Sequence, residues 1–218
     1  MKSKDIIISI LTAGAALLLS ACNGIFSDIY DSPEVESTLE YGFLQSSTAK
    51  TPGIIYIDAT DYSTWTYINL HNKTILPLSV DATEPEQWDF AIHRYDTKTN
   101  GGSVAETETT NFSVLNSFIP KNDNAYISDI WTTTTIVTDM STMMDGYLSY
   151  ANSNYNTELS KWLNVDKSTM PPVYTPSNKV YILRLSDNTK AALCLNNYMD
   201  ESGIKGYMTI EYIYPLND

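Results

Sequence analysis

Alternation of apolar and polar residues is the main pattern in the chain after residue 53. Successive side chains of an extended chain point to opposite faces, so this period of two predicts β-strands. Runs rich in Val, Ile, Thr and aromatic residues carry the pattern between turn-forming residues. They predict strands over residues 54–57, 64–70, 74–80, 88–95, 130–137, 179–185, 190–196 and 206–214. The expected fold class is all-β, a single antiparallel β-domain of hairpins and meanders.

The run Trp88–Tyr95 is the most specific segment of the chain, and a turn signal follows it. Asn100-Gly101-Gly102 tolerates positive φ angles, so we expect a turn there to close the strand. Within the strand, His93 shares a face with Asp89. We expect His93 to form a structural hydrogen bond with Asp89 or with a neighbouring strand, and not to bind a metal.

Three other segments are less regular. His71-Asn72-Lys73 is predicted to be a turn between two strands, with His71 facing solvent and no histidine or cysteine partner nearby. Residues 102–120 are polar and predict a loop or a weak edge strand. Residues 157–162 permit a short helix.

Composition and charge restrict the possible functions. The chain has 218 residues, which fits one domain with room for a core, and its 16 Tyr and 4 Trp suit a pleated, half-buried sheet. The formal net charge is −13 and becomes −14 without residues 1–21, because two lysines and one aspartate leave with them. No basic patch is available for a phosphate backbone, so we expect no nucleic-acid partner.

Residues 1–21 have the features of a lipoprotein signal peptide. Two lysines precede an apolar run over residues 6–19, which is too short to span a bilayer because a spanning helix needs about 20 residues. Leu19-Ser20-Ala21-Cys22 resembles the bacterial lipobox, so we predict lipidation at Cys22. Residues 22–52 are polar and acidic and predict a lipidated tether to a membrane. The β-domain then occupies residues 53–218.

The sequence offers little support for catalysis. His71 and His93 are the only histidines, and neither lies in a pattern typical of a hydrolytic triad or a zinc site. No Gly-rich phosphate loop occurs. Cys194 lies within a predicted strand, and we expect it to be a small buried residue. We therefore predict that the protein is not an enzyme.

Methionines are concentrated in two loops. Met140, Met143 and Met144 lie within five residues, and Met170 directly precedes Pro171. Packing is one interpretation, because methionine often fills gaps in protein cores. Ligation is the other, because thioether sulfur is a soft donor suited to haem iron and the flanking Ser, Thr, Asp and Gly are unusual in a core.

Several motifs, in order, resemble those of the HmuY family, haem-binding lipoproteins of Bacteroidota. The strand and turn at 88–102 carry the strongest likeness. The remaining motifs are Ile57-Asp58-Ala59, Trp65-Thr66-Tyr67, Pro172-Val173-Tyr174, residues 179–184, Asn197-Tyr198 and residues 209–215. The similarity covers residues 54–216.

The resemblance implies an all-β haemophore with ligand-holding loops at one end. It would bind haem b (iron protoporphyrin IX), acquire it from host haemoproteins and deliver it to a TonB-dependent outer-membrane receptor. The resemblance also implies a lipid-anchored location in the outer membrane, at the cell surface, with a shed extracellular form as well.

Family members use a histidine pair or a methionine pair as axial ligands. This sequence has no histidine after His93, so the resemblance implies the methionine-ligated branch. Met170 matches the second ligand position. Met143 is our choice for the first, Met144 follows it closely, and Met140 is third.

A surface adhesion or glycan-binding lipoprotein is the alternative function. The many Tyr and Trp side chains can stack on sugars, although a β-core also accounts for them.

Overall fold

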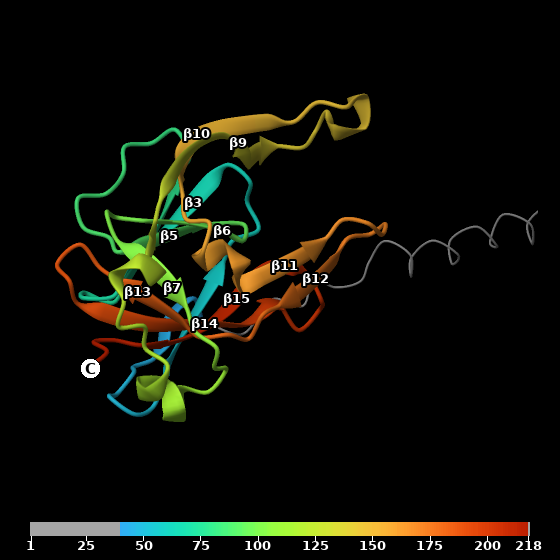
Figure 1. The fold of residues 1–218 in the computed structure, drawn as a ribbon. Coiled ribbons are helices and arrows are strands. Elements are labelled where there is room, and N and C mark those ends of the chain that lie inside the picture. Colours follow the sequence, from blue (N-terminus) through green and yellow to red (C-terminus); the bar gives the residue numbers. More distant parts are fainter. Residues whose placement is uncertain (1–39, 218) are drawn as a thin grey trace, which may run out of the picture. The chain divides into compact units, whose positions relative to one another are not determined.

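The computed structural model describes residues 40–217, and Figure 1 shows their ribbon. The predicted signal peptide, Cys22 and the tether up to residue 39 lie outside the described residues. The described chain contains strands and four short 3-10 helices, and every strand pair is antiparallel. The predicted all-β class is confirmed.

The elements follow one another in this order. They are β1 (Gly42–Gln45), β2 (Gly53–Asp58), β3 (Thr64–Asn69), β4 (Thr74–Ser79), β5 (Phe90–His93), β6 (Asp96–Thr99), β7 (Ser103–Glu106), η1 (Phe112–Ser117), η2 (Asp123–Ala125), β8 (Ile127–Ser128), β9 (Ile130–Asp139), η3 (Met143–Asp145), β10 (Ser149–Tyr155), η4 (Leu159–Trp162), β11 (Leu163–Asp166), β12 (Val173–Pro176), β13 (Tyr181–Arg184), β14 (Lys190–Met199) and β15 (Lys205–Ile213).

Two sheets enclose the main core. The larger has the strand order β1-β2-β15-β14-β13-β7-β8, and the smaller has the order β4-β3-β5-β6. Alternate residues of the central strands point between the sheets, as Ile55 and Ile57 do from β2 and Phe90 and Ile92 do from β5. Burial of these side chains at about 25 cal/mol per Å² is the main force that holds the sheets together.

The outer face of the larger sheet is buried as well. Ile182 of β13 and Cys194 of β14 form a second apolar cluster with Leu115 of η1 and with Tyr126. Cys194 is 5% exposed, as predicted for a small buried residue, and burial raises the pKa of its thiol to about 11. The segment between β7 and β8 therefore covers this face of the sheet.

Several strands lie outside the predicted ranges: β10, β11 and β12 fall between the strands predicted at 130–137 and 179–185, and two shorter strands change the expected boundaries. Residues 42–45, which we assigned to the tether, form β1 and pair with β2. Residues 103–106, which we assigned to a loop or weak edge, form β7 and pair with both β13 and β8. Both strands are only four residues long, and their short sequences contain little alternation that a sequence pattern could register.

The single strand predicted over 88–95 is wrong. β5 ends at His93, Arg94 adopts a positive φ of 57°, and the chain reverses at Arg94 and Tyr95 into β6. The turn that we placed at Asn100-Gly101-Gly102 instead follows β6. An arginine at positive φ is uncommon and gives no sequence signal for a hairpin turn.

β6 escaped prediction because it is polar and yet fully buried. Its Lys98 is 3% exposed and lies among the rings of Trp65, Tyr67 and Trp88, at 4.4, 4.8 and 5.4 Å from their centroids. The ammonium also donates hydrogen bonds to the Tyr67 hydroxyl at 3.0 Å and to Glu84 at 2.6 Å. Cation–π contacts and this ion pair replace the water that the charge loses on burial.

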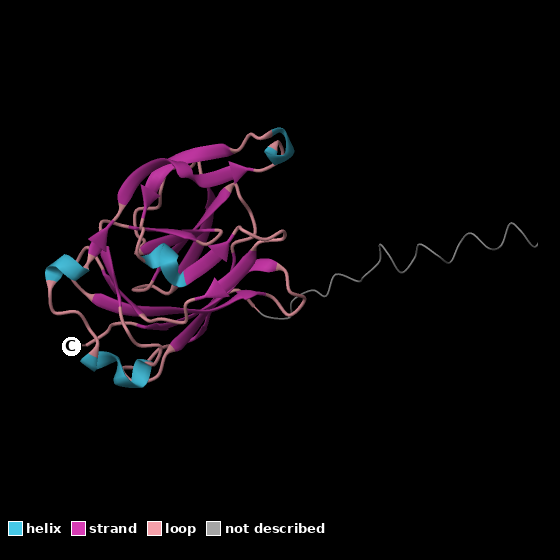
Figure 2. Cartoon of the chain, turned by 45° about the vertical axis from the view of Figure 1, so that its right-hand side comes forward, coloured by secondary structure: helices cyan, strands magenta, loops and turns pink. Residues whose placement is uncertain are grey.

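Two hairpins project from the sheets. β9 pairs with β10, and β11 pairs with β12, each as a separate two-stranded ribbon (Figure 1). Figure 2 shows η3 at the tip of the first hairpin, while the permitted helix at 157–162 is the 3-10 helix η4, which leads into β11. The indole of Trp162 donates a hydrogen bond to the carbonyl oxygen of Tyr95 at 2.9 Å. This bond ties the base of the second hairpin to the β5–β6 turn.

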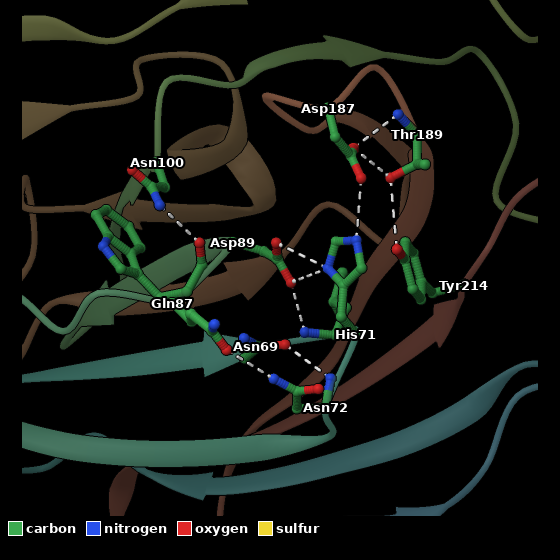
Figure 3. Close-up of polar contacts among 11 residues, drawn as sticks. Asn69, His71, Asn72, Gln87, Asp89, Asn100, Asp187, Thr189 and Tyr214 are labelled. Atoms are coloured by element: carbon green, nitrogen blue, oxygen red, sulfur yellow. Dashed lines mark hydrogen bonds and ion pairs between the residues drawn. The ribbon is translucent and has the colours of Figure 1, made fainter.

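His71 lies in the turn between β3 and β4, as predicted, but it has partners there that we did not expect (Figure 3). Its Nδ1 is 3.3 Å from Asp89 Oδ2, and its Nε2 is 3.1 Å from Asp187 Oδ2. Burial lowers the pKa of His71, but the two carboxylates outweigh it, so the net shift is upward from 6.5. The imidazole thus links the β3–β4 turn to the turn between β13 and β14.

We predict that His71 stabilises the fold more at low pH. Its raised pKa means that the stabilisation is full below 6.5 and disappears as the pH rises through the folded-state value. The side chain is 41% exposed, so solvent screening limits the effect to about 1 kcal/mol or less. Urea unfolding of the wild type and His71→Gln at pH 5.5 and 8.5 should show a larger loss at pH 5.5. An equal loss at both values would contradict this role.

Candidate functional site

A cavity of about 730 Å³ lies between the two hairpins and the β5–β6 turn. Its volume is within the usual range for small-molecule sites, roughly 300–1,000 Å³. Aliphatic and aromatic side chains form most of its walls, including Val137, Leu148, Tyr150, Leu163, Val165 and Tyr174. A planar apolar ligand of considerable size would fit such walls.

Three of the candidate methionines line this cavity. Met140 and Met143 come from the tip of the β9–β10 hairpin, and Met170 comes from the loop between β11 and β12. Met143 is 43% exposed and Met170 is 86% exposed. Core packing does not account for side chains this exposed. The structure thus brings together thioethers that are separated by 27 residues or more in the sequence.

Met144 has a different orientation from its neighbour. It is 90% exposed and is not among the residues that line the cavity. The 3-10 turn Met143–Asp145, which ends at Gly146 with a φ of 84°, separates the directions of adjacent side chains. Among the sequence candidates, Met143 therefore faces the cavity and Met144 faces solvent.

Arg94 braces the cavity wall near the β5–β6 turn. Its Nη1 donates hydrogen bonds to the carbonyl oxygens of Ala59 and Thr60, and its guanidinium lies 4.5 Å from the centroid of Tyr62. Gly206 has a φ of 111°, and a Cβ there would lie 3.0 Å from Thr60 Cα and 2.8 Å from the same Nη1, so any side chain at that position would be strained. Arg94 is only 9% exposed, and its Nε is buried without a hydrogen-bond partner among the described residues.

Three tyrosines extend this wall towards the second hairpin. Tyr95 packs edge-on against Tyr174 and Tyr198, with centroid separations of 6.2 and 6.1 Å. Tyr174 of β12 stacks on Tyr198 of β14 at 5.5 Å. These contacts fix the position of β12 relative to the β5–β6 turn.

His93 lines the cavity as a structural residue. Its Nε2 is 2.7 Å from the carbonyl oxygen of Tyr62, and its ring lies 5.4 Å from that of Trp65. Burial lowers its pKa, so the neutral imidazole donates this hydrogen bond from Nε2. The hydrogen bond that we predicted for His93 is present. Its partner is the chain just before β3, and Asp89 is bound to His71 instead.

Asp96 is an unexpected acid in the cavity wall. It is 9% exposed, and its carboxyl group has no hydrogen-bond partner among residues 40–217. Burial raises its pKa to about 7, and the positive charge of Lys167 opposes part of that shift. Lys167 lines the same cavity from the loop that carries Met170.

The model of the HmuY protein family matches residues 61–212 of the chain. This match spans well over half of the sequence. The chain belongs to the HmuY family. The family comprises haem-binding proteins. A comparison with curated protein sequences gave no match to the chain.

Solved structures agree with this assignment. A protein from Bacteroides vulgatus, described as HmuY-like and haem-binding, is 53% identical, with a TM-score of 0.76 over 82% of this chain and 100% of that one. A lipoprotein from Bacteroides fragilis is 50% identical, with a TM-score of 0.77 over 84% and 100% of the two chains. The apo HmuY analogue of Tannerella forsythia, at 22% identity and a TM-score of 0.63 over 74% and 94%, shares the fold.

Two kinds of feature were not found among the described residues: a cluster of metal-binding side chains and a membrane-spanning helix. Among residues 40–217, no group of three or more His, Cys, Asp or Glu side chains could hold a metal ion. The same described residues contain no helix long and apolar enough to cross a membrane.

The sequence did not point to Arg94, Asp96 or Lys167 as members of the site. Arg94 lies in the unpredicted hairpin turn, Asp96 directly follows it, and Lys167 lies in a polar loop. Nothing in their local patterns distinguishes them from surface charges. Their place in the cavity depends on contacts between segments that are far apart in the chain.

We predict that Asp96 destabilises the empty protein at high pH. An acid whose folded-state pKa is raised favours the unfolded state increasingly as the pH rises from 3.8 to about 7. Asp96→Asn should therefore increase the free energy of unfolding by about 2–4 kcal/mol at pH 8 and by about 1 kcal/mol or less at pH 4.5. Urea unfolding at the two values measures the difference.

Asp139→Asn is a suitable control for this prediction. Asp139 is exposed, and hydrogen bonds from Ser141 lower its pKa. The sign of the effect is therefore reversed, and its substitution should not stabilise the protein at pH 8. A destabilised Asp96→Asn variant at pH 8 would show that Asp96 has a partner in solution.

Proposed function

We propose that the protein is a haemophore that binds haem b through axial thioethers of Met143 and Met170. It acquires haem from host haemoproteins and passes it to a TonB-dependent outer-membrane receptor. Lipidated Cys22 anchors it in the outer membrane, at the cell surface. The observation that carries the proposal is the pair of exposed methionines on two separate hairpins that line one apolar cavity.

The chemistry of the cavity supports haem as the cargo. Apolar and aromatic walls match the faces of a porphyrin, and two thioether sulfurs are suitable soft donors for its iron. The Bacteroides vulgatus relative described as haem-binding is 53% identical, and the match covers the whole of its own length. Neutral thioether ligands favour the reduced iron, because they do little to stabilise the higher charge of the oxidised form.

Met143 is our choice for the first ligand, and Met140 and Met144 are the other candidates on the same hairpin. Met140 also lines the cavity, from the end of β9, whereas Met144 faces solvent. Met143 and Met170 lie on opposite hairpins, so a planar ring between them would expose one face to each sulfur. Lateral entry between the hairpins would also leave the packed sheets undisturbed.

The glycan-binding alternative has less support from the described residues. Trp65, Trp88 and Trp162 are buried in the core or in the cage around Lys98, so they are not available to sugars. Trp131 and Tyr41 are exposed, but Tyr41 is stacked on Tyr56 at 5.5 Å. Failure to bind haem would favour this alternative.

Titration with haemin, with and without dithionite, tests the proposal directly. We expect a Soret band characteristic of bound haem in both states and tighter binding in the reduced state, because both ligands are neutral soft donors. Equal affinity in the two states would contradict dithioether ligation. The absence of any new Soret band would overturn the haemophore function itself.

Substitution of the two ligands by leucine tests the residue assignment. Met143→Leu and Met170→Leu keep the cavity apolar but remove one thioether each. Each should abolish the low-spin spectrum of the reduced complex and weaken haem binding by roughly tenfold or more, the scale on which even outer-shell substitutions act at metal sites. Met144→Leu is the matched control and should leave both unchanged, since that side chain faces solvent. A low-spin spectrum retained by Met143→Leu and lost in Met140→Leu would transfer the first ligand to Met140.

A further inference from the structure

Asp96 and Lys167 are opposite charges on two different walls of the cavity. Asp96 begins β6, next to the hairpin turn, and Lys167 follows β11. Asp96 is nine-tenths buried, and neither side chain forms a hydrogen bond or a close ion pair with any residue in the described range 40–217. Lys167 nevertheless acts on the charge of Asp96.

A buried carboxyl group without a partner is costly in an empty protein. Burial of an unpaired polar group costs a few kcal/mol, so such groups are normally bonded within the fold. Apolar walls and the porphyrin ring cannot supply the missing hydrogen bond. The arrangement is therefore suited to a ligand that brings a polar group of its own to this part of the cavity.

The charged and titratable groups near Asp96 make part of their hydrogen bonds within the fold, while the buried Arg94 Nε and His93 Nδ1 have no partner among residues 40–217. Arg94 donates to the carbonyl oxygens of Ala59 and Thr60, and His93 is neutral and bonded to Tyr62. Tyr95 and Tyr155 face the acid, and burial raises the pKa of both hydroxyls, so they remain neutral. Lys167 lines the cavity and is exposed, so its ammonium is available to a ligand beside Asp96.

Haem carries two propionate carboxylates on one edge of its ring. We propose that Asp96 and Lys167 form a subsite for one of these propionates, which fixes the edge by which the ring enters the cavity. The Asp96 carboxyl group would share a proton with the propionate in a short O–H···O⁻ hydrogen bond, and the Lys167 ammonium would balance the remaining negative charge.

This inference rests on the proposed function and extends it. Its support is the pairing of a nine-tenths buried, unbonded acid with a free cation in the cavity that Met143 and Met170 line. Because burial raises the pKa of Asp96 to about 7, the carboxyl group holds a proton for part of the time at neutral pH and can act as a donor. Ligand recognition by this pair depends on the carboxylate and not on the iron.

A comparison of haemin with haemin dimethyl ester tests the subsite. The ester has the same ring and iron but carries no free carboxylate. Both are titrated under reducing conditions in the same cosolvent, with the Soret band as the readout. We expect the wild type to bind haemin about tenfold more tightly than the ester, the scale of one charge-assisted hydrogen bond.

Two variants should abolish this preference. Asp96→Leu and Lys167→Met each remove one member of the pair, and each should bring the haemin-to-ester affinity ratio close to one. Lys167 is exposed, so its substitution does not threaten the fold. Lys121→Met removes an exposed lysine away from the cavity and should leave the ratio at the wild-type value. Met170→Leu should weaken the binding of both haemin and the ester and leave their affinity ratio unchanged.

The outcomes separate this inference from the proposed function. A haemin Soret band with equal affinity for the ester in the wild type would overturn the subsite and leave the haemophore function intact. A wild-type preference that survives in both Asp96→Leu and Lys167→Met would also overturn it. No Soret band with either ligand would overturn both proposals together.

Discussion

Arg94 holds together the segments on which the cavity depends. Its backbone takes the positive φ that reverses β5 into β6, and its guanidinium binds two carbonyl oxygens in the β2–β3 loop and covers the ring of Tyr62. Gly206 at the start of β15 lies beside this guanidinium, and its φ of 111° disfavours any side chain there. Charge-assisted hydrogen bonds of this kind are strong and directional, so the turn and the loop form one rigid wall. Both hairpins then extend outwards from this rigid base.

The sheets and the projecting hairpins have different roles. The apolar clusters between and outside the sheets provide stability, whereas the hairpins carry exposed side chains that contribute little to it. Exposed thioethers cost almost nothing in the folded state and are available to a ligand. Asp96 is the opposite case, because burial raises its pKa and its carboxylate form is expected to lower stability. Such a group is expected at a binding site, where ligand contacts compensate for it.

Buried polar residues explain why β6 differs from the predicted fold. Strands with an apolar face, such as residues 54–57 and 206–214, were predicted within one or two residues of β2 and β15. β6 was missed because it buries Asp96, Thr97 and Lys98, which are normally read as a surface turn. The cage of aromatic rings that shelters Lys98 comes from β3 and from Trp88. No local pattern can signal a partner that the fold supplies from elsewhere.

The sequence by itself determined the all-β class, most of the central strands and the two methionine-bearing loops, because side-chain alternation and loop composition are local properties. It also carried the likeness to the HmuY family, which the family match confirmed. Only the tertiary structure decided that Met143 and not Met144 lines the cavity, that Met170 lies in the same cavity, and that Asp96 and Lys167 join them. These facts depend on contacts between hairpins that are far apart in the sequence. The burial of a side chain and the direction in which it points are set by those contacts and not by the local sequence.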